Sequence, residues 1–340
     1  MFSIVVVLAF IEDFLPQNVK IACFVLFCMA MFVAIVTKEA GCDPDYHVYE
    51  ALFYNNDDEL VELATEPFFI HMSRAILAVG GGMGMLIFIN ALISLPIKMT
   101  VLYKMSPYLF LPLVIYLPVY YELHDLIQMR ASMAAAFMML SAYLRYKERY
   151  AWCIFFAIMA CTSHYSAFIS LPIIAIGNIR HTSISRCVMA GSLFVGYACY
   201  FAHFDVFSLI PSSMLGGKVD LYRSKDSADF VEMNLYTNAY FMMKFVLVLV
   251  MLYYYKYLAD RVRYFSLLIN TLFLSVMCMF LFSTVPVMAF RFSEFLGVFD
   301  AVTIPFLVYL VSPRWVGKIC VIIIGTYMLM FNLLVSQYFT

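Results

Sequence analysis

Charged residues are scarce in this chain of 340 residues, and their scarcity excludes an ordinary soluble protein. Only 13% of the residues are Asp, Glu, Lys or Arg, whereas 65% are hydrophobic and the mean hydropathy is +0.90. A soluble domain is nearer half apolar and about a quarter charged. A membrane is therefore the main solvent of the chain, and no segment is long and polar enough to form a separate soluble domain. We expect one integral membrane domain over residues 1–340.

Three further absences narrow the class of protein. The net charge is -1 and there is no cationic tail, which argues against a nucleic-acid partner. Only Cys42 lies in a long polar loop, so a disulfide framework is not expected. The segment from Met1 to Phe10 is apolar but has no basic region before it, so we interpret it as a short membrane segment and not as a removed signal.

Long apolar runs are what the sequence does contain. A spanning helix needs about 20 mainly apolar residues, and the runs between charged clusters predict about twelve spans in an all-α, polytopic transmembrane helical bundle. They lie near residues 1–12, 19–37, 79–97, 105–122, 124–144, 150–165, 166–179, 187–204, 236–255, 264–283, 292–311 and 317–338. The pair 150–165 and 166–179 is either two spans or one broken helix.

The charges in alternate loops predict the orientation. Thirteen cations against four acids lie in one set of loops, which we assign to the cytoplasm because cytoplasmic loops are rich in Lys and Arg. These cations are Lys20, Lys98, Lys104, Arg145, Lys147, Arg149, Arg180, Arg186, Lys256, Arg261, Arg263, Arg314 and Lys318. The other set includes loop 38–78, with nine acids, and loop 205–235. We expect these two loops to face outward.

The end of the first outer loop has the pattern of a helix followed by a hinge. Glu66 and Pro67 form a helix start, and the residues up to Ala78 alternate at helical spacing, so we expect a helix lying in the membrane interface. The glycine-rich run 80–84 lacks the preceding strand and the following Lys-Ser/Thr of a phosphate loop. A hinge is the better interpretation.

Two clusters on the outward side combine acids with aromatic or basic groups. In the first, Asp43 and Asp45 precede Tyr46 and Tyr49; they could bind sugar hydroxyls or a divalent metal, but a solvated acidic loop carries the same residues. We expect no metal. The second contains Arg130 inside a predicted helix, preceded by Glu122, His124, Asp125 and Gln128. Arg130 is either functional, a snorkelling arginine at the membrane boundary, or an arginine neutralised by Asp125 or Glu122.

Two more clusters lie near the ends of later spans. His164, with Tyr165 and Ser166, interrupts an apolar hairpin and could act in proton transfer or be structural. Arg291 is flanked by aromatic residues; it could bind phosphate oxygens or simply pair with Glu294 three residues later. Tyr222, Arg223 and Lys225 are further outward groups in loop 205–235, where a solvated loop would carry such residues anyway.

The ordered set of these clusters resembles the EpsG family, the Wzy-like polymerases of bacterial exopolysaccharide, capsule and O-antigen. The resemblance covers roughly residues 20–310. Its motifs are Asp45-Tyr46-x-x-Tyr49, Ile127-Gln128-Met129-Arg130, the basic turn Arg145-Tyr146-Lys147-Glu148-Arg149, His164-Tyr165-Ser166, and Arg291-Phe292-Ser293-Glu294-Phe295. Where the family often has an arginine before the first motif, this chain has Lys38 and Glu39.

The resemblance implies a glycosyltransferase of GT-C-like architecture in the bacterial inner membrane, without a cofactor. It would move a growing glycan from undecaprenyl pyrophosphate to a new lipid-linked repeat unit on the outer face. Its partners would be that lipid-linked oligosaccharide, membrane lipid and a chain-length regulator protein. We predict that Arg130 and Arg291 stabilise the leaving pyrophosphate, helped by Arg223, and that His164 accepts the acceptor's proton, with Asp45 or Glu66 as the competing base.

The remaining outward residues of these motifs are predicted to bind substrate. They are Tyr46, Tyr49, Glu66, Gln128, Tyr165, Ser166, Tyr222, Arg223 and Glu294. Two other functions stay open: a flippase or transporter for lipid-linked sugars, and an O-antigen ligase. A transporter usually has deep ionisable groups and repeated halves; only Asp300 and Lys244 look deep here, and no repeat is evident. A third alternative is a metal-dependent transferase that uses Asp43 and Asp45.

Overall fold

Helices account for the regular structure of this chain. The computed structural model describes residues 1–41, 43, 45–209 and 234–338, and this part contains helices and no strand. It divides into two units, residues 1–175 with 300–340 and residues 176–299. An all-helical architecture follows from the sequence because a chain in lipid must satisfy its backbone hydrogen bonds within each segment.

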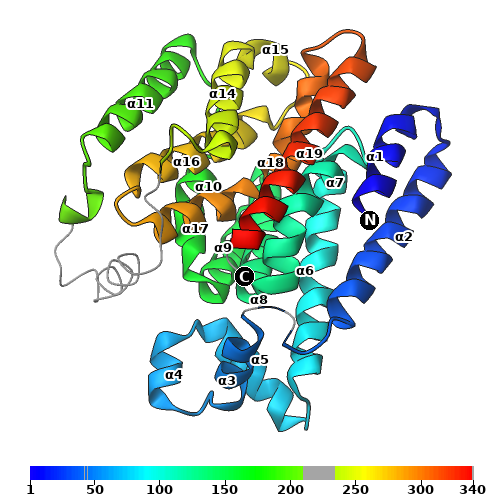
Figure 1. The fold of residues 1–340 in the computed structure, drawn as a ribbon, viewed down its shortest axis with the longest axis vertical. Coiled ribbons are helices and arrows are strands. Elements are labelled where there is room, and N and C mark those ends of the chain that lie inside the picture. The colour runs from blue at the N-terminus through cyan, green and yellow to red at the C-terminus, as the bar shows by residue number, and fades with distance from the viewer. Residues whose placement is uncertain (42, 44, 210–233, 339–340) are drawn as a thin grey trace. The chain divides into compact units, whose positions relative to one another are not determined.

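The first unit contains most of the elements in Figure 1. The α-helices are α1 (Phe2–Ile11), α2 (Gln17–Val36), α3 (Tyr46–Tyr54), α4 (Glu59–Ala64), α5 (Pro67–Ala78), α6 (Met83–Met105), α7 (Leu111–Tyr116), α8 (Met129–Tyr146), α9 (Tyr150–Ser163), α10 (Leu171–Ile176), α18 (Asp300–Thr303) and α19 (Arg314–Tyr338). Between them lie the 3-10 helices η1 (Glu12–Phe14), η3 (Tyr165–Ser170) and η5 (Ile304–Tyr309), and the π-helix η2 (Leu117–Ile127).

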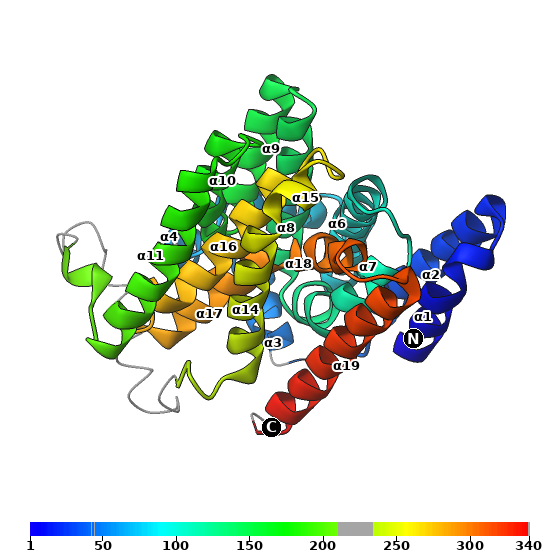
Figure 2. The same cartoon turned by 90° about the horizontal axis from the view of Figure 1, so that it is seen from above.

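The core of the first unit forms around α6, α7 and α8. α8 packs against α6 and α9, α2 against α6, and α19 against α7 and α1, which Figure 2 shows from above. The helices α3, α4 and α5 gather at one end of this unit, beyond the end of α6 at which Met83 lies (Figure 1). The first turn of α8 and the last turn of α9 are joined to this group by the contacts described below. The acidic loop 38–78 is thus folded into helices.

The second unit contains α11 (Ser183–Phe201), η4 (Val206–Leu209), α14 (Ala239–Tyr253), α15 (Tyr255–Ala259), α16 (Phe265–Leu281) and α17 (Pro286–Gly297). α16 packs against α17, α11 and α14. Asn238 and Thr182 cap the starts of α14 and α11 through side-chain oxygens.

Membrane-length helices occur in both units. In the described part of the chain, four helices are long and apolar enough to cross a membrane, namely Gln17–Val36, Met83–Met105, Ser183–Phe201 and Arg314–Leu334. A fifth arises if Pro286–Gly297 and Asp300–Tyr309 form one span. The chain is a membrane protein. Each of the twelve apolar segments contains a helix, although several are shorter than a full span.

Several boundaries differ from those expected. The helix expected at 79–97 begins at Met83 and continues to Met105. The break expected at residue 123 lies instead at Gln128, after the π-helix. The segment 150–179 is broken at His164, whose backbone is extended at φ -158° and ψ 128°. The glycine run does join two helices, α5 and α6. Gly80 adopts φ +76°, a conformation that is unfavourable for residues with a side chain.

Candidate active site

Glu66 lies where the chain enters α5 and presents its carboxylate to two other elements. Pro67 occupies the first position of α5 and Glu66 is the N-cap, with extended backbone angles. The Glu66 side chain does not cap its own helix. It is only 4% exposed, and an isolated buried carboxylate would be costly. The contacts of Glu66 with α8 and with the end of α9 meet this requirement.

Arg130 provides the first of these contacts. Its Nη1 donates a hydrogen bond to Glu66 Oε2 at 2.5 Å. The guanidinium also lies 5.3 Å from the centre of the Tyr49 ring and 5.8 Å from that of Phe69. Arg130 stands in the first turn of α8, where the helix dipole disfavours a cation. The carboxylate and the aromatic faces together offset that cost.

His164 provides the second contact. Its Nδ1 lies 2.7 Å from Glu66 Oε1, and its Nε2 lies 3.3 Å from Ser166 Oγ. A carboxylate accepts hydrogen bonds, so the neutral imidazole carries its proton on Nδ1, and its Nε2 is an acceptor that faces the Ser166 hydroxyl. The extended backbone at His164, between α9 and η3, directs the ring toward Glu66. We call these three side chains the Glu66–Arg130–His164 cluster.

The cluster is charged. Burial alone would raise the pKa of Glu66, but the hydrogen bond with His164 and the charge of Arg130 outweigh burial and lower that pKa from 4.5 to about 2. Burial raises the pKa of the neighbouring Tyr49 to about 12, although Arg130 opposes this effect. At neutral pH the cluster therefore contains a carboxylate and a guanidinium, and the neighbouring Tyr49 phenol is neutral.

A small cavity lies beside Arg130. It contains about 180 Å³ of empty space, including its open mouth. Its lining consists of aromatic, thioether and polar side chains, namely Phe68, Phe69, Met72, Asn90, Arg130, Met133 and Ser163. Asn90 Nδ2 donates to the carbonyl oxygen of Met129 at 3.0 Å, which fixes the wall next to Arg130. Arg130 Nε has no hydrogen-bond acceptor within the described residues, so it is a donor available to a ligand.

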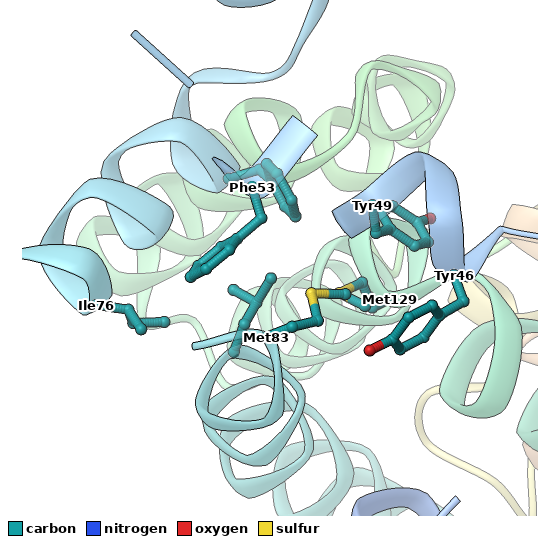
Figure 3. Close-up of a cluster of buried hydrophobic side chains, with 8 residues drawn as sticks. Tyr46, Tyr49, Phe53, Ile76, Met83 and Met129 are labelled. Carbon is teal, nitrogen blue, oxygen red and sulfur yellow. The ribbon is translucent and has the colours of Figure 1, made fainter. Parts of the chain in front are cut away.

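The first outer cluster, which contains Asp45, Tyr46 and Tyr49, packs next to this site. Tyr46 and Tyr49 lie on α3 and are 9% and 4% exposed. Figure 3 shows both rings among buried hydrophobic side chains that include Met83 and Met129. Asp45 is the N-cap residue of α3, without a side-chain capping bond. Sugar binding by these residues stays a prediction; their packing holds α3 against the start of α8.

Lys38 joins the same loop to the π-helix. Its ammonium group lies 2.6 Å from Asp43 Oδ2 and also donates to the carbonyl oxygen of Leu126. In the described residues no group of three His, Cys, Asp or Glu side chains is placed to hold a metal ion. The cation paired with Asp43 is the ammonium group of Lys38.

The neutralising partner of Arg130 is Glu66, and the alternative that assigned this role to Asp125 or Glu122 is wrong. Asp125 instead pairs with Lys98 and accepts from Tyr116, while Ser132 Oγ donates to it at 2.7 Å. Glu122 accepts a hydrogen bond from Asn332 at 2.9 Å.

Lys98 was expected in a cytoplasmic loop, and this expectation is also wrong. The side chain is fully buried within α6, where it pairs with Asp125 and donates to Ser132 Oγ at 2.8 Å. Lys98 ended the apolar run in the sequence, but the helix continues because the carboxylate of a distant segment satisfies the charge. Asp300 and Lys244, expected to be deep, are 1% and 2% exposed.

The other predicted site residues adjoin the cluster in sequence, belong to the second unit, or lie outside the described residues. Gln128 is the break between η2 and α8, and Tyr165, next to His164, is 40% exposed. Arg291 and Glu294 lie one turn apart on α17, in the second unit. Tyr222, Arg223 and Lys225 belong to residues 210–233, which the structure does not describe.

Sequence reasoning missed Asn90 and Phe69. Asn90 is a polar residue within an otherwise apolar run, and buried polar groups in membrane helices are often functional, so this signal was present. No comparable signal distinguished Phe69 among 33 phenylalanines. Its relevance comes from its position in the first turn of α5.

The fold and the cluster together define an α-helical membrane protein with a partly buried carboxylate–guanidinium–imidazole cluster at one end of its first unit. The chain belongs to the EpsG family, whose model matches residues 19–339, and the members of this family are Wzy-like polysaccharide polymerases. No curated protein and no solved structure matches the chain.

Proposed function

We propose that this protein is a glycosyltransferase that polymerises undecaprenyl-pyrophosphate-linked oligosaccharide repeat units on the outer face of the bacterial inner membrane. Family membership supports polysaccharide polymerisation in general. The observation that carries the proposal is the Glu66 carboxylate shared by Arg130 and His164 beside a cavity. This arrangement combines a base with a cation, the two groups that the reaction needs.

The acid–base step is assigned to His164. As the acceptor hydroxyl oxygen forms a bond to the anomeric carbon, His164 Nε2 takes its proton, and the Glu66 carboxylate at 2.7 Å stabilises the imidazolium. Glu66 itself is a weak base, because a carboxyl group with a pKa of about 2 holds a proton poorly at neutral pH. Glu66 therefore serves as the positioning residue, and Asp45 is the less favoured base.

Stabilisation of the leaving group is assigned to two arginines. The bond between the anomeric carbon and the pyrophosphate oxygen breaks with both electrons on that oxygen, which leaves additional negative charge on the carrier lipid. Arg130, through its unpaired Nε, and Arg291 are the proposed stabilising cations. Arginines can supply this stabilisation without a metal ion.

The membrane arrangement is part of the proposal. We infer that the shorter apolar helices also cross the membrane, giving about twelve spans in a GT-C-like bundle. They include Tyr150–Ser163, Tyr165–Ile176, Ala239–Tyr253 and Phe265–Leu281. The basic turn 145–149 lies between α8 and α9, at the opposite ends of these helices from Arg130 and His164. The positive-inside rule then puts the cluster outside.

Reconstitution tests the reaction directly. The purified protein, supplied with lipid-linked repeat units, should produce polymer, and Arg130→Ala, His164→Ala and Arg291→Ala should each reduce its formation. Arg74→Gln is the matched control, since Arg74 lies on α5 but pairs with the exposed Glu62 at 2.8 Å. Full activity of Arg130→Ala or Arg291→Ala at normal expression would remove that arginine from the mechanism.

A deletion strain separates the competing functions. Single repeats on the acceptor indicate lost polymerisation, absence of attached glycan indicates lost ligation, and repeats trapped on the cytoplasmic face indicate lost flipping. Inactivation by a chelator would instead favour the metal-dependent alternative at Asp43 and Asp45.

A further inference from the structure

A second polar cluster lies at one end of the second unit, where two basic segments meet. Asn178 Nδ2 donates to the carbonyl oxygen of Arg263 at 2.5 Å, and Arg180 pairs with Asp260. The backbone N–H of His181 donates to Tyr255 Oη at 2.9 Å. Segments 177–186 and 255–264 therefore lie side by side.

The two segments carry a concentrated positive charge. They contain five cations, Arg180, Arg186, Lys256, Arg261 and Arg263, and one acid, Asp260, so their formal net charge is +4 (five minus one). Asp260 already pairs with Arg180. The surface is thus suited to an anion.

The centre of the cluster is a network around His181. His181 Nε2 lies 2.7 Å from Asn270 Oδ1, and Tyr255 Oη lies 2.5 Å from Ser266 Oγ. The Arg186 guanidinium lies 5.6 Å from the centre of the Tyr255 ring. α11, α15 and α16 all contribute to this network, so its geometry is built from several helices.

Two buried donors in this network have no acceptor among the described residues, namely Asn270 Nδ2 and Arg186 Nε. Asn270 is 5% exposed. A buried donor without an acceptor destabilises the folded protein, so both favour a ligand that accepts hydrogen bonds. Arg186 also stands in the first turn of α11, where backbone N–H groups and the helix dipole favour an anion.

Exposed apolar and tyrosine side chains at the ends of α11 and α14 next to this cluster in the sequence indicate a membrane boundary. On α11, Ile184 and Val188 are 77% and 64% exposed. Tyr253 and Tyr254, at the end of α14, are 77% and 45% exposed. Exposed aliphatic side chains together with tyrosines and cations at helix ends are typical of the boundary between lipid tails and headgroups.

We propose that this cluster binds the phosphate group of an anionic phospholipid, with Arg186 and Asn270 as the donors and the acyl chains extending from this end of the helices into the membrane. The site belongs to the basic, cytoplasmic set of loops and is independent of the proposed polymerase reaction. Basic pockets between membrane helices bind lipid phosphates in this way. Inorganic phosphate offers the same oxygen acceptors without the chains, so the experiment compares the two sources.

The test uses the full-length protein in phosphatidylcholine nanodiscs, with and without cardiolipin, and in detergent with inorganic phosphate. Cardiolipin should raise the Tm of the wild type and remain bound in native mass spectrometry. Arg186→Gln should bind it about tenfold more weakly or worse, as expected for the loss of a charge-assisted hydrogen bond. Arg149→Gln, which removes an exposed cation from the turn before α9, should bind it like the wild type.

The outcomes are distinct. Stabilisation by cardiolipin alone supports a lipid site, whereas equal stabilisation by inorganic phosphate supports the phosphate site but overturns the lipid assignment. Equal weakening in Arg149→Gln and Arg186→Gln would show only a diffuse charge effect and overturn the proposal. If Arg186→Gln does not fold in phosphatidylcholine, Arg186→Lys, which keeps the charge but lacks the Nε donor, replaces it; binding equal to that of the wild type would overturn the donor assignment.

Discussion

Replacing Glu66 with Gln tests the candidate active site most directly. The substitution keeps the size of the side chain and removes the negative charge that Arg130 and His164 share. A pKa lowered from 4.5 to about 2 corresponds to about 3 kcal/mol of stability at neutral pH. Glu66 is only 4% exposed, so solvent screens this contribution little. Removing one partner of a buried ion pair lowers stability by a comparable amount, about 3–5 kcal/mol.

The pH dependence distinguishes a charge effect from simple loss of packing. The pKa of Glu66 is lower in the folded protein, so the contribution is fully present above the unfolded value of 4.5 and is lost as the pH falls toward 2. We therefore expect Glu66→Gln to lower the Tm by about 6 °C at pH 7 and by less than half of that near pH 3.

The assay is thermal unfolding of the wild type, Glu66→Gln and Glu62→Gln in detergent between pH 3 and pH 7. Glu62 is the matched control, because it also pairs with an arginine but is exposed at 52% of its side chain. Its replacement should leave the Tm unchanged. A Tm difference for Glu66→Gln that stays constant across this pH range would refute the electrostatic explanation.

Three further predictions follow from named contacts. Arg130→Lys should fold but lose most polymer formation in the reconstituted assay, because a lysine has no planar guanidinium to bind Glu66 and a phosphate together; activity close to that of the wild type would contradict this role. Lys98→Met should destabilise the protein by about 3–5 kcal/mol in thermal unfolding, since it leaves Asp125 buried without its cation, and Lys98→Met with Asp125→Leu should recover most of that loss. Gly80→Ala should lower stability by about 1 kcal/mol because Gly80 adopts φ +76°, and an unchanged Tm would show that the hinge can readjust.

Part of the candidate site could be recognised without a structure. Arg130 and His164 stand out because each interrupts an apolar run, and a polar group in a membrane segment needs a partner or a function. Glu66 was a candidate base and substrate-binding residue on the basis of its outward loop. Its role as the shared partner of both residues was beyond prediction, since Glu66 is 64 residues from Arg130 and 98 from His164.

The error at Lys98 has the same origin. A lysine at the end of an apolar run is a reasonable loop marker, because an unpaired charge in lipid is costly. Asp125 pairs with Lys98 inside the first unit, and the helix continues to Met105. The pairing of two charges 27 residues apart depends on how helices pack, which local hydropathy does not contain.

The sequence by itself determined that this is a helical membrane protein, that Pro67 begins a helix, and that the chain breaks near His164, because apolar composition, proline geometry and hydrogen bonding act within a few neighbouring residues. Only the tertiary structure decided which acid neutralises Arg130, that Lys98 is buried, and which donors of the second unit lack acceptors. Those outcomes depend on distances between segments far apart along the chain, where the cost of burying a charge is met by whichever partner the packing supplies.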